Sequence, residues 1–169
     1  MKKLLILFLL FASTSFGQVH KHTIGARFGY GYYLGPEFSF HLGLSDHHRF
    51  ELDAGYLYSN GGFSGKPAHA RLAATVAFHW DYNLFDGLNW FVGPAVQLGP
   101  YMYFNGVDPS YFYVAVGAQV GLEYDFSNRF RNVPLVVGLD HRPMIDVIRF
   151  SNWQYDGHIA ASVRYILND

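Results

Sequence analysis

The chain has 169 residues, with 12 basic residues, 13 acidic residues and no cysteine. This length suits one domain, and the lack of cysteine excludes a disulfide framework and a lipid-anchored cysteine. The mild acidity gives no electrostatic footprint for nucleic acid, so no nucleic-acid partner is expected.

The first 17 residues have the three parts of a secretory signal peptide. Lys2 and Lys3 form a basic start, residues 4–12 are an apolar run, and Ser15 and Gly17 are small residues before the predicted cut. We therefore expect residues 1–17 to be a signal peptide and residues 18–169 to form the single mature domain. No later run of 18 apolar residues occurs, so we expect no membrane helix.

The rest of the chain alternates apolar and polar residues with a period of two, which is typical of β-strands. Clusters of Asn, Asp, Gly, Ser and Pro interrupt the alternation, as turns require. Short connections between consecutive strands indicate an antiparallel meander. Pro94 and Pro100 predict bulges in the fifth strand, because proline cannot donate to a ladder. The predicted strands are 22–32, 36–44, 49–59, 71–82, 88–104, 112–126, 135–145 and 158–167.

All charged residues of these segments fall on one face, and the other face is apolar. In residues 112–126, for example, Phe112, Val116 and Val120 lie on one side, whereas Gln119 and Glu123 lie on the other. A soluble barrel of the lipocalin kind would turn the apolar face inward, and a membrane barrel would turn it outward. The charged face carries Glu37, Glu51, Asp53, Asp81, Glu123, Asp125, Asp140, Arg27, Arg49, Arg71, Arg142 and Arg164.

Three observations favour the membrane barrel. All ten glycines within the predicted strands lie on the charged face, where a crowded interior needs room for long side chains. The mature chain has only Lys21 and Lys66, fewer lysines than a soluble exterior carries. Aromatic residues gather at both ends of the strands, as at the two membrane interfaces. One predicted rim holds Phe50, Trp80, Tyr82, Trp90, Tyr124, Phe126 and Tyr165, and the other holds Tyr30, Tyr32, Tyr56, Tyr58, Phe104, Phe112 and Phe150.

With these segments and rims the chain resembles the small outer-membrane barrels of the OmpA transmembrane-domain and OmpX type. The resemblance implies an all-β fold, an eight-stranded antiparallel up-and-down transmembrane β-barrel in the outer membrane of a Gram-negative bacterium. It also implies a monomer whose partners are outer-membrane lipid and the outer-membrane assembly machinery, with no cofactor. Such barrels usually finish on an aromatic residue, whereas this chain ends with Asn168 and Asp169.

A barrel of eight strands is just wide enough for its own side chains, so a filled cylinder is expected rather than a diffusion pore. The inward charges would pair with one another, because an unpaired buried charge is costly. We expect the mid-height residues Arg27, Asp53, Asp140 and Arg142 to pair most tightly. Glu51, Asp81, Glu123 and Asp125 are expected near the periplasmic end, where water and Arg164 reach them. The predicted interior network is Arg27, Asp53, Asp140, Arg142, Arg71, Arg164, Glu51 and Glu123.

Three functions fit such a barrel. The leading one is a structural or surface-interaction role without catalysis, for which the outward loops would expose Phe63, Tyr111, Trp153 and Tyr155. A narrow, porin-like gated ion path along the interior charges is the second. A lipid A-modifying enzyme is the third, with "GLDHRPMID" (138–146) as the best local candidate, where Pro143 predicts a bulge beside His141.

Histidines near the periplasmic rim do not form a defined tetrahedral set, so no metal site is expected. These histidines are His20, His22, His47 and His48.

Overall fold

The computed structural model describes residues 22–31, 33–59, 69–103, 106–127, 130, 133–148 and 155–167, with the backbone alone at 69, 101–103, 106–111 and 155–156. All regular structure in these residues is β. The strands are β1 (His22–Gly31), β2 (Gly35–Ser45), β3 (His48–Ser59), β4 (His69–Phe85), β5 (Leu88–Tyr103), β6 (Gly106–Asp125), β7 (Leu135–Asp146) and β8 (Tyr155–Leu167).

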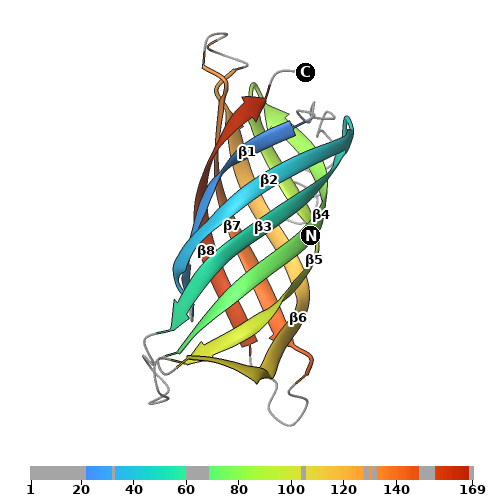
Figure 1. Cartoon of the computed structure of the whole chain (residues 1–169). Helices are drawn as coiled ribbons and strands as arrows, with labels where there is room; N and C mark the ends of the chain where they lie inside the picture. Colours follow the sequence, from blue (N-terminus) through green and yellow to red (C-terminus); the bar gives the residue numbers. More distant parts are fainter. Residues whose placement is uncertain are drawn as a thin grey trace, which may run out of the picture.

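The eight strands form a closed barrel in which each strand is antiparallel to its neighbours in the sequence (Figure 1). β1 closes the barrel by pairing with β8, from His22 opposite Leu167 to Gly31 opposite His158. The predicted fold class is therefore confirmed. Closure leaves no open sheet edge, so each strand has a hydrogen-bonded neighbour on both sides. The described part of the chain contains no helix long and apolar enough to cross a membrane.

The predicted strands differ from the observed ones mainly at β4 and β6. β4 begins at His69 and ends at Phe85, and β6 begins at Gly106 rather than near residue 112. The turn-forming residues at 105–111 suggested a longer loop. The β5–β6 ladder instead continues across this stretch, with Met102 opposite Val107.

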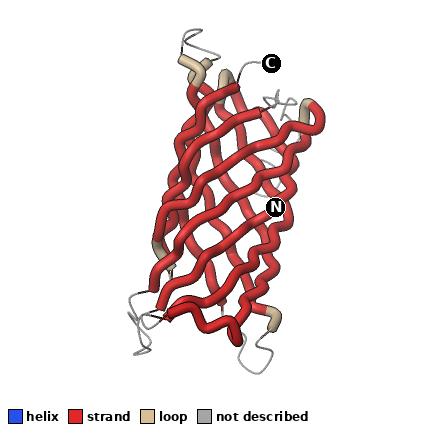
Figure 2. Tube along the Cα trace, in the orientation of Figure 1, coloured by secondary structure: helices blue, strands red, loops and turns tan. Residues whose placement is uncertain are grey.

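The two ends of the barrel are distinct, and we name them by their connections. The turn end holds the start of β1, the end of β8 and the connections at 46–47, 86–87 and 126–134. It is uppermost in Figure 1. The loop end holds the ends of β1, β3, β5 and β7 and the starts of β2, β4, β6 and β8. The long strands β4, β5 and β6 form part of the barrel wall and extend to this loop end, as the trace in Figure 2 also shows.

The turn between β4 and β5 depends on one glycine. Gly87 has a φ of 84°, in the left-handed region that side chains with a Cβ rarely adopt. Its carbonyl also accepts a hydrogen bond of 2.7 Å from the backbone N–H of Asp125, which ties the turn to the end of β6. The sequence "FDG" at 85–87 therefore specifies both the reversal and its anchoring.

Side chains alternate between the two faces as the period-two pattern predicts. On β6, Phe112, Val116 and Val120 face outward, whereas Gln119 and Glu123 are buried inside. The outward surface is a belt of large apolar side chains from all eight strands. It includes Phe28, Phe38, Leu52, Leu72, Val76, Val96, Leu98, Leu122, Leu139, Ile159 and Val163.

Aromatic rings contact one another at the turn end. Tyr82 and Trp90 stack with their ring centroids 4.7 Å apart, and Tyr124 contacts Phe126 edge-on at 4.9 Å. At the loop end, Tyr30, Tyr56 and Phe112 point outward. Three members of that predicted rim, Tyr32, Phe104 and Phe150, lie outside the described residues.

The three prolines within β5 and β7 behave differently from one another. Pro100 lies at a register shift between β5 and β6, as predicted. The predicted bulges at Pro94 and Pro143 are wrong, because the registers of β5 with β6 and of β7 with β8 run through them unchanged. A proline can stay in register where its missing N–H is accommodated by the facing strand.

On β5 a glycine precedes each proline and allows β4 to lie close to β5 beside it. In the β4–β5 register Pro94 faces Phe78, and its nitrogen has no hydrogen to donate to the Phe78 carbonyl. A Cβ added to Gly93 would lie 1.6 Å from that carbonyl oxygen. Only glycine therefore permits the close approach of the two strands. The pair Gly99 and Pro100 repeats the arrangement at Leu72, where the corresponding distance is 1.7 Å.

Candidate functional site: the barrel interior

The inward faces of the strands bring nearly all charged side chains of the sheet into the barrel. Five arginines occupy this space: Arg27, Arg49, Arg71, Arg142 and Arg164, none more than 6% exposed. The interior is narrow, and the inward glycines show how closely it is filled. A Cβ added to Gly121 would lie 2.5 Å from the ring of Phe91.

The first charge cluster lies at mid-height around Arg27. Its guanidinium donates two hydrogen bonds to the carboxylate of Asp140, Nε to Oδ2 at 3.0 Å and Nη2 to Oδ1 at 2.5 Å. Nη1 also donates to Glu37 on β2 and lies 3.0 Å from His158 Nε2 on β8. One side chain of β1 thus contacts residues of three other strands. Its bidentate contact with Asp140 is the strong form of an arginine–carboxylate pair.

The second cluster lies around Arg142 of β7. Its Nη2 donates to Asp53 and, at 3.0 Å, to Glu51 Oε1, both on β3. Its Nε donates to Gln119 Oε1 at 3.1 Å, and the Gln119 amide lies within 3.3 Å of Glu51. Because β3 and β7 lie on opposite walls of the closed barrel, these contacts cross the lumen.

The third cluster lies toward the turn end. Arg49 donates to Glu123 at 2.6 Å and lies 3.2 Å from Asp81. Arg164 reaches Glu123 at 2.9 Å. Arg164 also lies 3.3 Å from Glu51, so Glu51 joins this cluster to the Arg142 cluster. The charges form one connected set from mid-height to the turn end.

The structure corrects two expectations about these charges. Glu51, Asp81, Glu123 and Asp125 are not water-accessible rim acids, because each is at most 3% exposed. The mid-height set is also not balanced by two arginines and two aspartates alone, because Arg27 and Arg142 pair with glutamates as well. Sequence alone could not reveal this, since side chains of four or more atoms reach along the barrel axis.

Arg71 differs from the other four arginines. It lies between two rings, with its guanidinium carbon 3.7 Å from the Tyr33 ring centroid and 4.0 Å from that of Tyr113. Its Nη2 donates to Gln97 Oε1 at 2.9 Å, and the Tyr113 hydroxyl donates to the same oxygen at 3.0 Å. These cation–π and hydrogen-bond contacts fix the guanidinium near the loop end.

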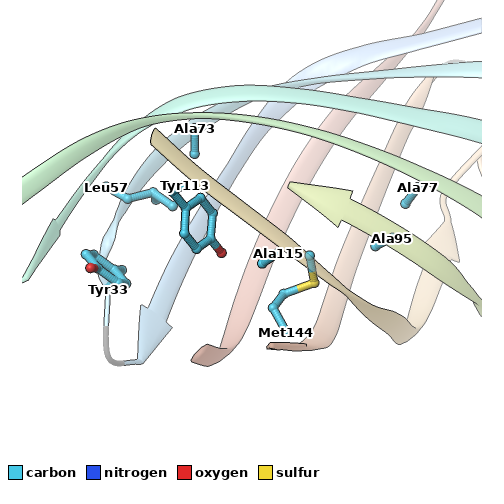
Figure 3. Packing of buried hydrophobic residues seen from close by; sticks show 8 residues of the cluster. All are labelled: Tyr33, Leu57, Ala73, Ala77, Ala95, Tyr113, Ala115 and Met144. Atoms are coloured by element: carbon cyan, nitrogen blue, oxygen red, sulfur yellow. The ribbon is translucent and has the colours of Figure 1, made fainter. Parts of the chain in front are cut away.

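Apolar side chains complete this part of the interior. Leu57, Tyr113 and Met144 are at most 1% exposed and pack with Tyr33 and several alanines (Figure 3). We call Tyr33, Leu57, Arg71, Tyr113 and Met144 the loop-end plug. Of these five residues the sequence analysis named only Arg71, although a signal for the others was present: Tyr113 alternates in phase with Glu123 on β6.

The loop aromatics proposed from the sequence are not placed by the structure. Phe63 and Trp153 lie outside the described residues, and so do the side chains of Tyr111 and Tyr155.

His141 lies on the wall, with its Nδ1 3.1 Å from the carbonyl oxygen of His158. Within the described residues, no group of three or more His, Asp or Glu side chains could hold a metal ion. His48 instead stacks on Phe78, with the ring centroids 5.6 Å apart.

Comparison with known proteins gives a match in structure but none in sequence. No protein-family model matches the chain, and no curated protein matches it by sequence. Among solved structures the fold is similar to that of Neisserial surface protein A, NspA, with a TM-score of 0.61 and 11% sequence identity. The match covers 86% of this chain and 94% of that one. The chain therefore has the fold of the small eight-stranded outer-membrane barrels.

Proposed function

We propose that this chain is an outer-membrane barrel with a closed, side-chain-filled interior that acts through its structure and its loop-end surface, without catalysis. The turn end would face the periplasm and the loop end the outside, with residues 1–17 removed during export. The outward apolar belt and the ring contacts at the turn end support this placement, because outer-membrane barrels carry such a band between aromatic girdles.

The ion pairs that cross the lumen carry the proposal of a closed interior. Arg142 joins β7 to β3, and Arg49 joins β3 to Glu123 of β6. The loop-end plug lies between these charges and the loop end. An ion moving along the axis would have to separate buried pairs, which costs several kcal/mol for each unpaired charge. A filled interior is also what eight strands allow.

Conductance in planar bilayers tests this function against the gated-pore alternative. Purified barrel should give no steady conductance above that of a mock preparation, because the paired charges and the plug obstruct the axis. Reproducible open channels of nanosiemens size would overturn the proposal and favour the pore.

A further inference from the structure

The outward surface of the described strands carries a depression that neither the fold nor the interior explains. It crosses four strands, β3 to β6, and has a volume of about 540 Å³. We call it the wall groove. Its lining includes Ala54, Tyr56, Leu72, Ala74, Leu98 and Phe112.

Two facing alanines create the groove. Ala54 of β3 is directly opposite Ala74 of β4, and both point outward. The next rung toward the loop end pairs Tyr56 with Leu72, and the next rung toward the turn end pairs Leu52 with Val76. Two methyl groups thus lie between rows of long side chains, which leaves a hollow in the belt. Leu98 and Phe112, 41% and 50% exposed, extend its wall over β5 and β6.

The chemistry of the lining restricts the occupant. Among the side chains that line the groove, only Tyr56 carries a polar atom, its hydroxyl. A peptide or a charged ligand would leave its own polar groups without partners there, which is costly in an apolar site. The occupant must therefore present hydrocarbon to the groove.

The place of the groove identifies that hydrocarbon. It lies within the outward apolar belt, at the level of Tyr56 and Phe112, on the loop-end half of the wall. In a membrane, this part of the wall faces the acyl chains of lipids.

A second copy of the protein fits the groove poorly. In a two-fold contact the same concave surface would face itself and leave an unfilled space, and stable interfaces need close packing over a much larger area.

We propose that the wall groove binds one acyl chain of a membrane lipid from the leaflet on the loop side. This inference rests on the membrane placement proposed above. The acyl chain is already surrounded by hydrocarbon in the bilayer. Its binding is therefore not favoured by removal of apolar surface from water. Binding is favoured instead by dispersion contacts between the acyl chain and the groove lining. An acyl chain that packs loosely among other lipids does not make these contacts.

Native mass spectrometry after reconstitution in dimyristoylphosphatidylcholine tests the proposal. The wild-type barrel should retain one lipid as activation energy is raised. Ala74→Leu and Ala54→Leu fill the groove from either strand, and each should lower the retained one-lipid species by about tenfold. Ala118→Leu is the matched control, because Ala118 also points outward but lies outside the groove. The control should retain lipid as the wild type does.

Each outcome decides the question. Retention that is equal in the wild type and both groove variants overturns the proposal, and so does a wild type that retains no lipid or a control that loses it. Each variant is first shown to be folded by its heat-modifiable migration on gels. A protein that stays soluble without detergent or lipid would overturn the membrane placement itself. A protein that needs detergent but shows no groove-dependent lipid retention would overturn only the proposed lipid site.

Discussion

Arg27 illustrates how a single residue holds this barrel together. Its side chain is fully buried, and its partners Glu37 and Asp140 come from β2 and β7. Replacing it removes one positive charge and leaves two carboxylates in a space that water reaches poorly. Removing one partner of a buried pair is far more damaging than replacing the whole pair by apolar groups.

We therefore expect Arg27→Ala to lower the free energy of unfolding by about 3–5 kcal/mol. Asp53→Ala should have a comparable effect, because it takes a partner from Arg142. Urea unfolding of the barrel in detergent, followed by circular dichroism, measures both. Asp46→Ala is the control, since Asp46 is exposed in the turn between β2 and β3. A harmless Arg27→Ala, or equal losses in all three variants, would contradict the pairing.

Gly121 is a second residue whose role can be isolated. An added methyl group would overlap the Phe91 ring, so Gly121→Ala should destabilise the barrel by about 1–3 kcal/mol through overpacking. In a Phe91→Ala background the same change should cost less, because the ring is gone and only the contact of 2.8 Å with Asp140 Cβ remains. A double-mutant cycle in urea measures the coupling. Additive effects of the two changes would show that the ring and the glycine do not compete for space.

At the level of strands, β5 shows most clearly what its sequence specifies. Two Gly-Pro pairs, six residues apart, face β4 and interrupt its ladder at Phe78 and Leu72. Each interruption leaves a backbone carbonyl without a ladder donor, which is unfavourable in a wall surrounded by hydrocarbon. The β4–β5 seam is therefore expected to be weaker at these two rungs than the continuous β3–β4 seam.

Pro94→Ala tests this expectation because it restores an N–H opposite the Phe78 carbonyl. The new amide should be protected from hydrogen exchange, and the barrel should gain about 0.5–1.5 kcal/mol of stability from the added hydrogen bond. Exchange measured by NMR in micelles reports the amide directly. The amide of Ala95, which lies in the uninterrupted β5–β6 ladder, provides the reference. Rapid exchange at residue 94 would show that the two strands do not meet there.

The alternation of apolar and polar residues predicted the number, order and facing of the strands, because a period of two follows directly from strand geometry. It could not predict which charges meet inside. Arg142 contacts Asp53 across the lumen, and that contact depends on the stagger of all the strands between them. The expectation of a bulge at Pro143 also failed, because the β7–β8 pairing keeps its register through this residue.

The whole molecule should show the solubility and gel migration that are typical of membrane β-barrels. We expect the mature chain to require detergent or lipid and to migrate differently on SDS gels before and after boiling. A closed barrel has no frayed edge from which the detergent can unfold it, so the unboiled form stays compact. The unboiled sample should also give β-type circular dichroism. A mature chain that is monomeric and soluble in plain buffer would contradict the outward placement of the apolar belt.

The ion pairs of the interior also constrain how such a molecule can assemble. The contacts of Arg27 with Asp140 and of Arg142 with Asp53 join residues 113 and 89 positions apart. A single hairpin entering the bilayer would carry charges that lack some of their partners, at a cost that hydrocarbon makes large: the β1–β2 hairpin pairs Arg27 with Glu37 but lacks Asp140 of β7. Asp140 reaches Arg27 only when β7 and β8 have joined β1, and Arg142 reaches Asp53 only when β7 lies across the lumen from β3. Insertion and closure must therefore proceed together, and the charges that stabilise the finished barrel make every partly inserted form of it unfavourable.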